Sequence, residues 1–248
     1  MKSLLFRCTI FLAILTVPLP SAAEPQTVNL YTYHTHPPFM NGNGEGMTFD
    51  LATFLNQRSN GKFDFKVAPS SRARINSLVE SDRWGVIPWV NPKWFNDPNK
   101  SLYLWSEQTL MQDANAIISH IRKPVDYQSA QTLQGMVFGG LNGHKYSGID
   151  KFISKGGDLR RLDANNHLDN FNKLLRGDID VMLMPQSGAL FSIAKHNFDK
   201  DFHISPTPHS RFERRLLIIN HRRQLQQFLD NILEEFEREW SAIVTRDE

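Results

Sequence analysis

Apolar residues recur along this chain with two spacings that alternate in order. The runs 27–33, 62–67 and Gly85–Val90 are short and rich in β-branched, aromatic or other apolar residues, which is typical of strands. Between them, Met47–Arg58 and 73–80 place apolar side chains on one face of a helix. This order of strands and helices predicts right-handed crossovers and a largely parallel sheet covered by helices on both faces.

The alternation restarts after the break at Lys123 and Pro124. The second series is expected to hold strands at 136–139, 159–162 and 179–184, and helices at 144–154, 166–175 and 188–195. A strand at 216–219 and a long amphipathic helix at 224–240 follow. The predicted fold class is therefore α/β and two-lobed, each lobe a mainly parallel sheet flanked by helices.

Two α/β units, the second inserted into the first, account for this order. The expected division is a signal segment at 1–23, a first lobe at 24–114, a crossing strand at 115–119, a second lobe at 120–205, and a second crossing with the return to the first lobe at 206–248. Two extended strands that join two lobes permit hinge closure over a ligand.

The first residues have the pattern of a cleavable secretory signal peptide. Lys2 and Arg7 form a basic start, 11–17 is apolar, and Ser21-Ala22-Ala23 supplies the small residues of a cleavage site. The apolar run is too short to span a bilayer, and no later segment reaches the ~20 apolar residues that a membrane helix needs. We therefore expect an exported protein that does not insert into a membrane after cleavage.

Cysteine use and charge exclude several classes of site. Cys8, inside the signal, is the only cysteine, so the exported chain has no disulfide, cysteine nucleophile or cysteine metal ligand. Removing the two basic residues of the signal from 28 leaves 26, equal to the 26 acidic residues, so no global field favours nucleic acid. The basic run 211–215 is interpreted as a solvated approach to the strand that follows it.

The stretch 84–94, Trp-Gly-Val-Ile-Pro-Trp-Val-Asn-Pro-Lys-Trp, is the strongest candidate for a binding wall. Pro88 removes a ladder donor, so the chain is expected to leave the sheet by Trp89. Ligands bind outside the carboxyl ends of strands in open α/β sheets, which makes Trp89, Asn91 and Trp94 one wall of a small-molecule cleft. The alternative is that both indoles are ordinary core residues.

Four short motifs in this order resemble the bacterial extracellular solute-binding proteins of family 3. They are His-Pro-Pro-Phe at 36–39, Gly-Met-Thr-Phe-Asp-Leu-Ala at 46–52, Leu-Gln-Gly at 133–135 and Leu-Arg-Gly-Asp-Ile-Asp-Val at 175–181. The resemblance spans nearly the whole exported chain. It implies the type II periplasmic binding fold, a periplasmic location, a small-molecule ligand and a membrane permease or sensor as partner.

Departures from that family's pattern concern the ligand. Amino-acid binders of the family usually have an arginine shortly after the strand equivalent to Gly85–Val90, where this chain has 91–95, Asn-Pro-Lys-Trp-Phe. They usually also have an aspartate after the strand equivalent to 179–184, where Pro185 and Gln186 stand. The arginine would bind the α-carboxylate of an amino acid and the aspartate its α-ammonium group. Because both are missing, an ordinary α-amino acid is not the expected ligand.

Further candidates lie on other cleft-side segments. Arg74 is expected near the start of a helix, where its guanidinium could bind a carboxylate or stack on a ring. Arg72 competes for this role. The alternative is that Arg74 is an ordinary surface arginine. The segment 141–146 is expected to open a helix, with Asn142 as its cap and an anion site at its backbone N–H groups, or else to be only a structural cap. The expected ligand-binding residues are Phe39, Arg74, Trp89, Asn91, Trp94, Asn142, His144, Tyr146, Gln186 and Ser187.

Metal binding and catalysis have weaker support. His34 and His36 point the same way in an extended chain, but no Cys, Asp or Glu lies near them in sequence, so no metal site and no cofactor are expected. Neither a Gly-x-Ser-x-Gly elbow nor a His-Glu-x-x-His motif is present. Asp50 is the nearest candidate for a catalytic base, and a helix residue favoured by the dipole is the alternative.

The sequence therefore predicts a non-enzymatic periplasmic solute-binding protein that captures a small organic solute for an ABC-type importer. The residues leave two alternatives open: a ligand-sensing module for a membrane receptor, and a dehydratase-like enzyme derived from the binding fold. We expect a monomer with no nucleic-acid partner.

Overall fold

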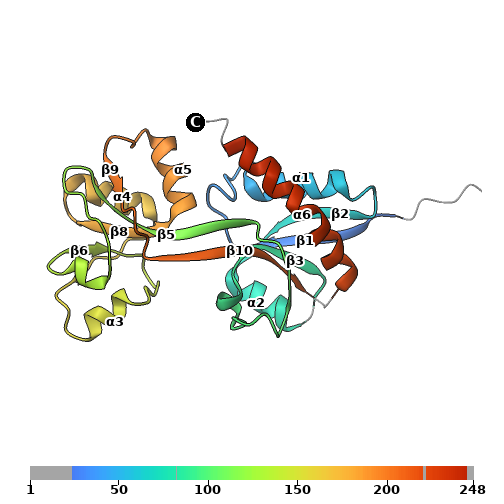
Figure 1. Cartoon of the computed structure of the whole chain (residues 1–248), viewed down its shortest axis with the longest axis horizontal. Helices are drawn as coiled ribbons and strands as arrows, with labels where there is room; N and C mark the ends of the chain where they lie inside the picture. Colours follow the sequence, from blue (N-terminus) through green and yellow to red (C-terminus); the bar gives the residue numbers. More distant parts are fainter. Residues whose placement is uncertain (1–23, 82, 220–221, 245–248) are drawn as a thin grey trace, which may run out of the picture.

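The computed structural model describes residues 24–81, 83–219 and 222–244, so the predicted signal peptide lies outside the described residues. Figure 1 shows two bodies joined by two long strands. The first lobe contains β1 (Gln26–Thr32), α1 (Met47–Arg58), β2 (Phe63–Pro69), α2 (Arg72–Glu80), β3 (Gly85–Val90), the 3₁₀ helix η1 (Pro92–Phe95), β4 (Leu104–Trp105) and α6 (Arg223–Val244). The second contains η2 (Ala130–Leu133), β6 (Val137–Gly139), α3 (Ile149–Ser154), β7 (Arg160–Arg161), α4 (His167–Arg176), β8 (Val181–Pro185), α5 (Gln186–His196) and β9 (Phe202–Ile204).

The two joining strands are β5 (Met111–His120) and β10 (Ser210–Ile219), and each belongs to both lobes. The strands follow the order β2-β1-β3-β10-β5-β8-β6-β7. The start of β10 pairs antiparallel with β5, and its end pairs antiparallel with β3. The end of β5 in turn pairs with β8. Chain crossings between the lobes are therefore built from continuous, hydrogen-bonded strands.

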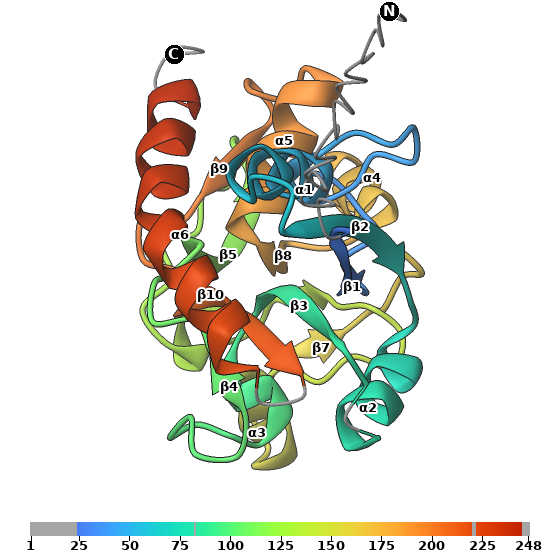
Figure 2. The ribbon, with the colours of Figure 1, turned by 90° about the vertical axis from the view of Figure 1, so that its right-hand side faces the viewer.

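Parallel pairing is confined to the interior of each lobe, as the alternating pattern predicted. In the first lobe β1 is parallel to β2 and β3, and in the second β6 is parallel to β7 and β8. Helices α1 and α6 pack against one face of the first sheet and α2 against the other (Figure 2). The second lobe likewise has α4 and α5 on one face and α3 on the other. The expected two-lobed α/β architecture is confirmed.

A bulge in β3 decides where Trp89 lies. Arg215 of β10 pairs with Val90 and Leu217 with Ile87, so β3 has one extra residue opposite β10. Trp89 takes a positive φ of 66° there, which is uncommon for a bulky residue. The extra residue reverses the alternation of side chains, and Trp89 joins Val86 on the face covered by α1 and α6.

Trp89 is consequently a core residue of the first lobe with no exposed surface. Its Nε1 donates to Thr48 Oγ1 at 3.0 Å, and its ring lies 5.5 Å from that of Phe39, which is also fully buried. The expectation that the chain leaves the sheet by Trp89 is wrong, because β3 continues through Val90. Pro88 is accommodated at the bulge, where a donor is not needed.

Two other expectations are corrected. The helix predicted at 144–154 begins only at Ile149, so Asn142 caps no helix and instead donates from Nδ2 to Asn165 Oδ1 at 2.9 Å. The run 211–215 is not a solvated approach, since the exposed fractions of Arg214 and Arg215 are 1% and 8%. Among the described residues, no helix is both long and apolar enough to cross a membrane.

Candidate functional site

A cavity of about 540 Å³ lies between the lobes and takes its walls from both. The first lobe and the joining strands contribute Tyr33, His34, His36, Arg72, Trp94, Asn115, Phe212 and Arg214. The second lobe contributes His144, Lys145, Tyr146, His167, Leu183, Met184 and Pro185. A separate hollow around Asp163, Asn165 and Lys173 is formed by the second lobe alone, so it cannot report lobe closure.

Strand ends and helix starts place these side chains. Tyr33 and His34 directly follow β1, Arg72 is the first residue of α2, and His167 is the first residue of α4. Pro185 ends β8. These positions lie at the carboxyl edge of the two sheets, which is where open α/β folds bind ligands.

Arg72 is held firmly at the cavity wall. Its guanidinium lies 5.0 Å from the Tyr33 ring centroid and 4.2 Å from that of Phe95. Nε donates to Asn76 Oδ1 at 2.9 Å, Nη1 donates to the Tyr33 hydroxyl at 2.9 Å, and Nη2 donates to the Trp94 carbonyl. Burial raises the pKa of Tyr33 above its ordinary value, although the charge of Arg72 opposes the shift. The Tyr33 hydroxyl is therefore protonated at neutral pH and accepts from Arg72.

Arg214 is the most buried cation of the wall. Its Nε donates to Asp113 Oδ2 at 2.8 Å, and both side chains are 1% exposed. Its Nη1 donates to the Trp89 carbonyl at 2.8 Å, while the guanidinium lies near the rings of Trp94 and Phe212, 5.4 and 5.1 Å from their centroids. Burial lowers the pKa of Arg214, and Asp113 opposes that effect. Because arginine's ordinary pKa is so high, Arg214 stays protonated at neutral pH.

Four histidines face the cavity, and two of them are neutral at pH 7. Burial first, and then the charges of Arg214, His36 and Arg72, lower the pKa of His34 well below 6.5. Burial, with the charges of His36 and His144, lowers the pKa of His167 to about 4. Within 24–81, 83–219 and 222–244, no group of three or more His, Cys, Asp or Glu is arranged to hold a metal ion.

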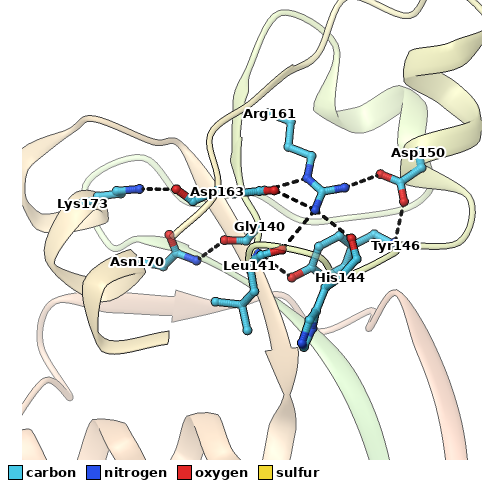
Figure 3. Close-up of polar contacts among 9 residues, drawn as sticks. All are labelled: Gly140, Leu141, His144, Tyr146, Asp150, Arg161, Asp163, Asn170 and Lys173. Carbon is cyan, nitrogen blue, oxygen red and sulfur yellow. Dashed lines mark hydrogen bonds and ion pairs between the residues drawn. The ribbon is translucent and has the colours of Figure 1, made fainter. Parts of the chain in front are cut away.

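The loop that carries His144 and Tyr146 is braced by Arg161 (Figure 3). Arg161 Nη2 donates to the carbonyls of Leu141 and His144 at 3.2 and 2.8 Å. Its guanidinium also lies over the Tyr146 ring, 5.0 Å from the centroid. One side chain thus ties β7 to the main chain of the cavity loop, so the loop has a defined shape before any ligand arrives.

Carboxylates hold Arg161 in turn. Asp163 Oδ1 accepts from its Nε at 2.6 Å and Asp150 Oδ1 from its Nη1 at 2.8 Å. Accordingly the pKa of Arg161 is raised, the hydrogen bond from Asp163 being the main cause. A Cβ added at Gly140 would collide with Asp163 and Arg161, which explains why glycine stands there. Figure 3 shows the whole network between β7, the loop and the start of α3.

Three of the ten predicted site residues line the cavity: Trp94, His144 and Tyr146. Phe39 and Trp89 instead belong to the core of the first lobe, because each has no exposed surface. Arg74 is exposed on α2. Its backbone N–H donates to Ser71 Oγ in the N-cap of the helix. The first turn of α2 therefore brings Arg72, and not Arg74, to the cavity.

The remaining four do not line the cavity either. Asn91 caps η1 through Lys93 N and donates to the Glu213 carbonyl at 2.9 Å. Asn142 belongs to the hollow on the second lobe. Gln186 and Ser187 begin α5 and line a different depression, and the Ser187 hydroxyl donates to Asp113 at 2.8 Å.

The sequence analysis did not identify several residues that line the cavity, although the sequence pattern could have indicated some of them. His167 opens the helix that follows a predicted strand, the same position that singled out Arg72 and Arg74. Phe212, Arg214 and Leu216 are spaced two residues apart, and the Leu216 side chain enters the core of the first lobe. Because alternate residues of a strand share a face, this spacing could have placed Phe212 and Arg214 together. Nothing local indicated that Arg214 would pair with Asp113, 101 residues away in sequence.

We expect Arg161→Gln to loosen the cavity loop. Losing a charged donor to two loop carbonyls and two carboxylates should lower the free energy of unfolding by about 1–2 kcal/mol. Amide hydrogen exchange of residues 141–146 should speed up at the same time. Arg160→Gln is the matched control, since Arg160 is the exposed neighbour on β7. Equal exchange rates in both variants would show that Arg161 does not brace the loop.

Acid should destabilise the folded protein through His167. Its pKa is about 4 when folded against an ordinary 6.5, so the unfolded chain binds this proton first as pH falls. Stability is therefore full above pH 6.5 and decreases toward pH 4, by at most ~1.4 kcal/mol per pH unit for one proton. Urea unfolding of His167→Gln should show a shallower loss than the wild type. His196→Gln, on the exposed side of α5, should keep the wild-type slope; an unchanged slope for His167→Gln would contradict the assignment.

No protein-family model and no curated protein sequence matches the chain. Solved structures do match it. An ancestral arginine-binding protein bound to arginine is 19% identical, with 86% of this chain and 92% of that chain covered and a TM-score of 0.62. An ancestral amino acid-binding protein, a precursor of cyclohexadienyl dehydratase, is 14% identical, with 86% and 89% covered and a TM-score of 0.59.

The substrate-binding protein of an amino acid ABC transporter also matches, at 12% identity and a TM-score of 0.58, with 86% of this chain and 94% of that chain covered. At such identities the likeness establishes the fold and no ligand. The chain has the two-lobed fold of the type II periplasmic binding proteins.

Proposed function

We propose that the protein captures a small organic solute between its two lobes outside the cytoplasm and delivers it to an ABC-type importer. The observation that carries the proposal is the cavity of about 540 Å³ with walls from both lobes. Its size and its mixture of aromatic and polar side chains suit a small-molecule site. Structural neighbours include the substrate-binding protein of an amino acid ABC transporter, which supports the same role here.

Capture requires no bond-making. A solute that enters the cavity loses water against the rings of Tyr33, Trp94 and Phe212, while polar groups of both lobes supply hydrogen bonds. Since the lobes are joined only by β5 and β10 in the described chain, closure over the solute needs rotation about those two strands. Binding energy from both lobes then favours the closed form.

An ordinary α-amino acid is not the solute we propose. No Asp or Glu is among the described residues that line the cavity, so an α-ammonium group would find no carboxylate. The positions after β3 and β8 hold Asn91 and Gln186 instead of a charged clamp, and neither side chain lines the cavity.

A dehydratase-like enzyme is the second candidate. It is favoured by one neighbour, the precursor of cyclohexadienyl dehydratase, and by His34 and His167, whose lowered pKa values leave neutral imidazoles at the cavity wall. A neutral imidazole can accept a proton from a substrate. Capture and catalysis differ in one outcome, which is whether the solute is recovered unchanged.

The test uses protein stripped of ligand by unfolding and refolding, then incubated with the small-molecule fraction of an extract from the producing cells. We expect one solute to be retained, identified by mass spectrometry, and recovered unchanged after hours. Conversion of that solute would favour the enzyme, and retention of nothing would contradict capture.

Trp94→Ala should raise the Kd of the retained solute by about tenfold or more, because a ring of the cavity wall is lost. Trp84→Ala is the matched control, since Trp84 donates to the Thr27 carbonyl and does not line the cavity. Melting temperatures of both variants separate a binding defect from a folding defect. Equal Kd values for the two variants would remove Trp94 from the site.

A further inference from the structure

The charges around the cavity are of one sign. Arg72, Lys145 and Arg214 line it, together with four histidines, while the described lining residues include no carboxylate. Histidine is either neutral or positive, so no side chain of the wall carries a negative charge at neutral pH. A bound solute therefore meets cations and neutral groups only.

The three cations are not equivalent. Asp113 neutralises Arg214 inside the structure, and the pair is almost completely removed from solvent. Arg72 has no carboxylate partner among the described ion pairs, since its nitrogens donate to the Asn76 amide, the Tyr33 hydroxyl and the Trp94 carbonyl. Its charge is thus left uncompensated at the cavity wall.

Arg72 also retains donors for a ligand. A guanidinium has five N–H groups, and the three hydrogen bonds use one on each nitrogen. One N–H on each terminal nitrogen remains, which is the number that a bidentate carboxylate takes. The contacts with the rings of Tyr33 and Phe95, together with the three hydrogen bonds, hold the guanidinium in place in advance, so little side-chain entropy is lost on binding.

The opposite wall supplies a second free cation, and apolar side chains contribute part of the surface between the two cations. Lys145 is exposed on the braced loop of the second lobe and has no ion-pair partner among the described residues. Trp94 and Phe212 have rings 5.3 Å apart on the first-lobe side, and Leu183 and Met184 face the cavity from β8. A flat apolar body with an acidic group matches this arrangement.

We propose that the solute is an aromatic or similarly flat organic acid without an ammonium group, its carboxylate held by Arg72 and, after closure, by Lys145. The proposal rests on the proposed function and narrows it to one ligand class. It assigns specificity to Arg72, a residue outside the two positions where a charged clamp was sought. The same cations that attract the carboxylate exclude amines and zwitterions, because the cavity offers an ammonium group no carboxylate.

Four compounds with the same ring and chain length test the class: 3-phenylpropionate, L-phenylalanine, 3-phenylpropan-1-ol and 3-phenylpropylamine. Calorimetry at low salt and pH 7.5 should give 3-phenylpropionate a Kd at least about tenfold lower than the alcohol or L-phenylalanine, with no binding of the amine. Comparable Kd values for acid and alcohol, tighter binding of L-phenylalanine or the amine, or no binding by any of the four would overturn the proposal.

Variants locate the carboxylate. Arg72→Gln should raise the Kd for 3-phenylpropionate by about tenfold and leave that for the alcohol unchanged, whereas Arg74→Gln, on the same helix but away from the cavity, should change neither. Because Arg72 also bonds Tyr33 and Trp94, Lys145→Gln serves as the variant with no packing to lose, and it should weaken the acid alone by several-fold. Acid binding that is insensitive to both Arg72→Gln and Lys145→Gln would overturn the assignment.

Failure of this proposal is distinguishable from failure of solute capture. If the solute retained from the cell extract carries an ammonium group, or if the four compounds fail while an extract solute is retained, capture stands and the organic-acid class is rejected. If no extract solute is retained at all, capture itself is rejected.

Discussion

One buried ion pair links the two strands that join the lobes. Asp113 of β5 and Arg214 of β10 lie 2.8 Å apart with 1% of each side chain exposed. Desolvation makes such a pair costly to form, and removing one partner of a buried pair typically costs about 3–5 kcal/mol because the other charge is left alone. Asp113 also accepts from the backbone N–H and the hydroxyl of Ser187, at 3.2 and 2.8 Å. The joining strand β5 is thereby linked to the start of α5 in the second lobe.

The same pair shapes the binding wall. Arg214 donates to the carbonyl of Trp89 at the β3 bulge and lies over the rings of Phe39, Trp94 and Phe212. The strands that cross between the lobes are consequently also part of the cavity surface. Rotation about the joining strands and binding of a solute therefore both act on the same side chains. Lobe closure and solute binding are coupled through these contacts. Asp113 bonds Arg214 and Ser187, whereas Arg72 and Lys145 have no carboxylate partner among the described ion pairs.

Local pattern was sufficient for most of the architecture. Periodicity predicted α1 with the bounds that the structure shows, and the strand-helix order predicted parallel pairing within each lobe. It failed at Trp89, where one extra residue in β3 turns the indole into the core; a bulge depends on pairing with β10, which local sequence does not contain. The choice of Arg72 over Arg74 depends on the helical phase relative to Tyr33 and Phe95. The Asp113–Arg214 pair depends on tertiary contact alone.

The central claim is that a solute in the inter-lobe cavity brings the lobes together by rotation about β5 and β10. Spin labels at Glu80→Cys on α2 and Lys151→Cys on α3, both exposed, report the separation of the lobes in a chain starting at Glu24, which has no other cysteine. Pulsed electron resonance should show a broad distance distribution without solute, and a shorter, narrower one with the solute retained from the cell extract. An unchanged distribution in protein that mass spectrometry shows to be loaded would contradict the account.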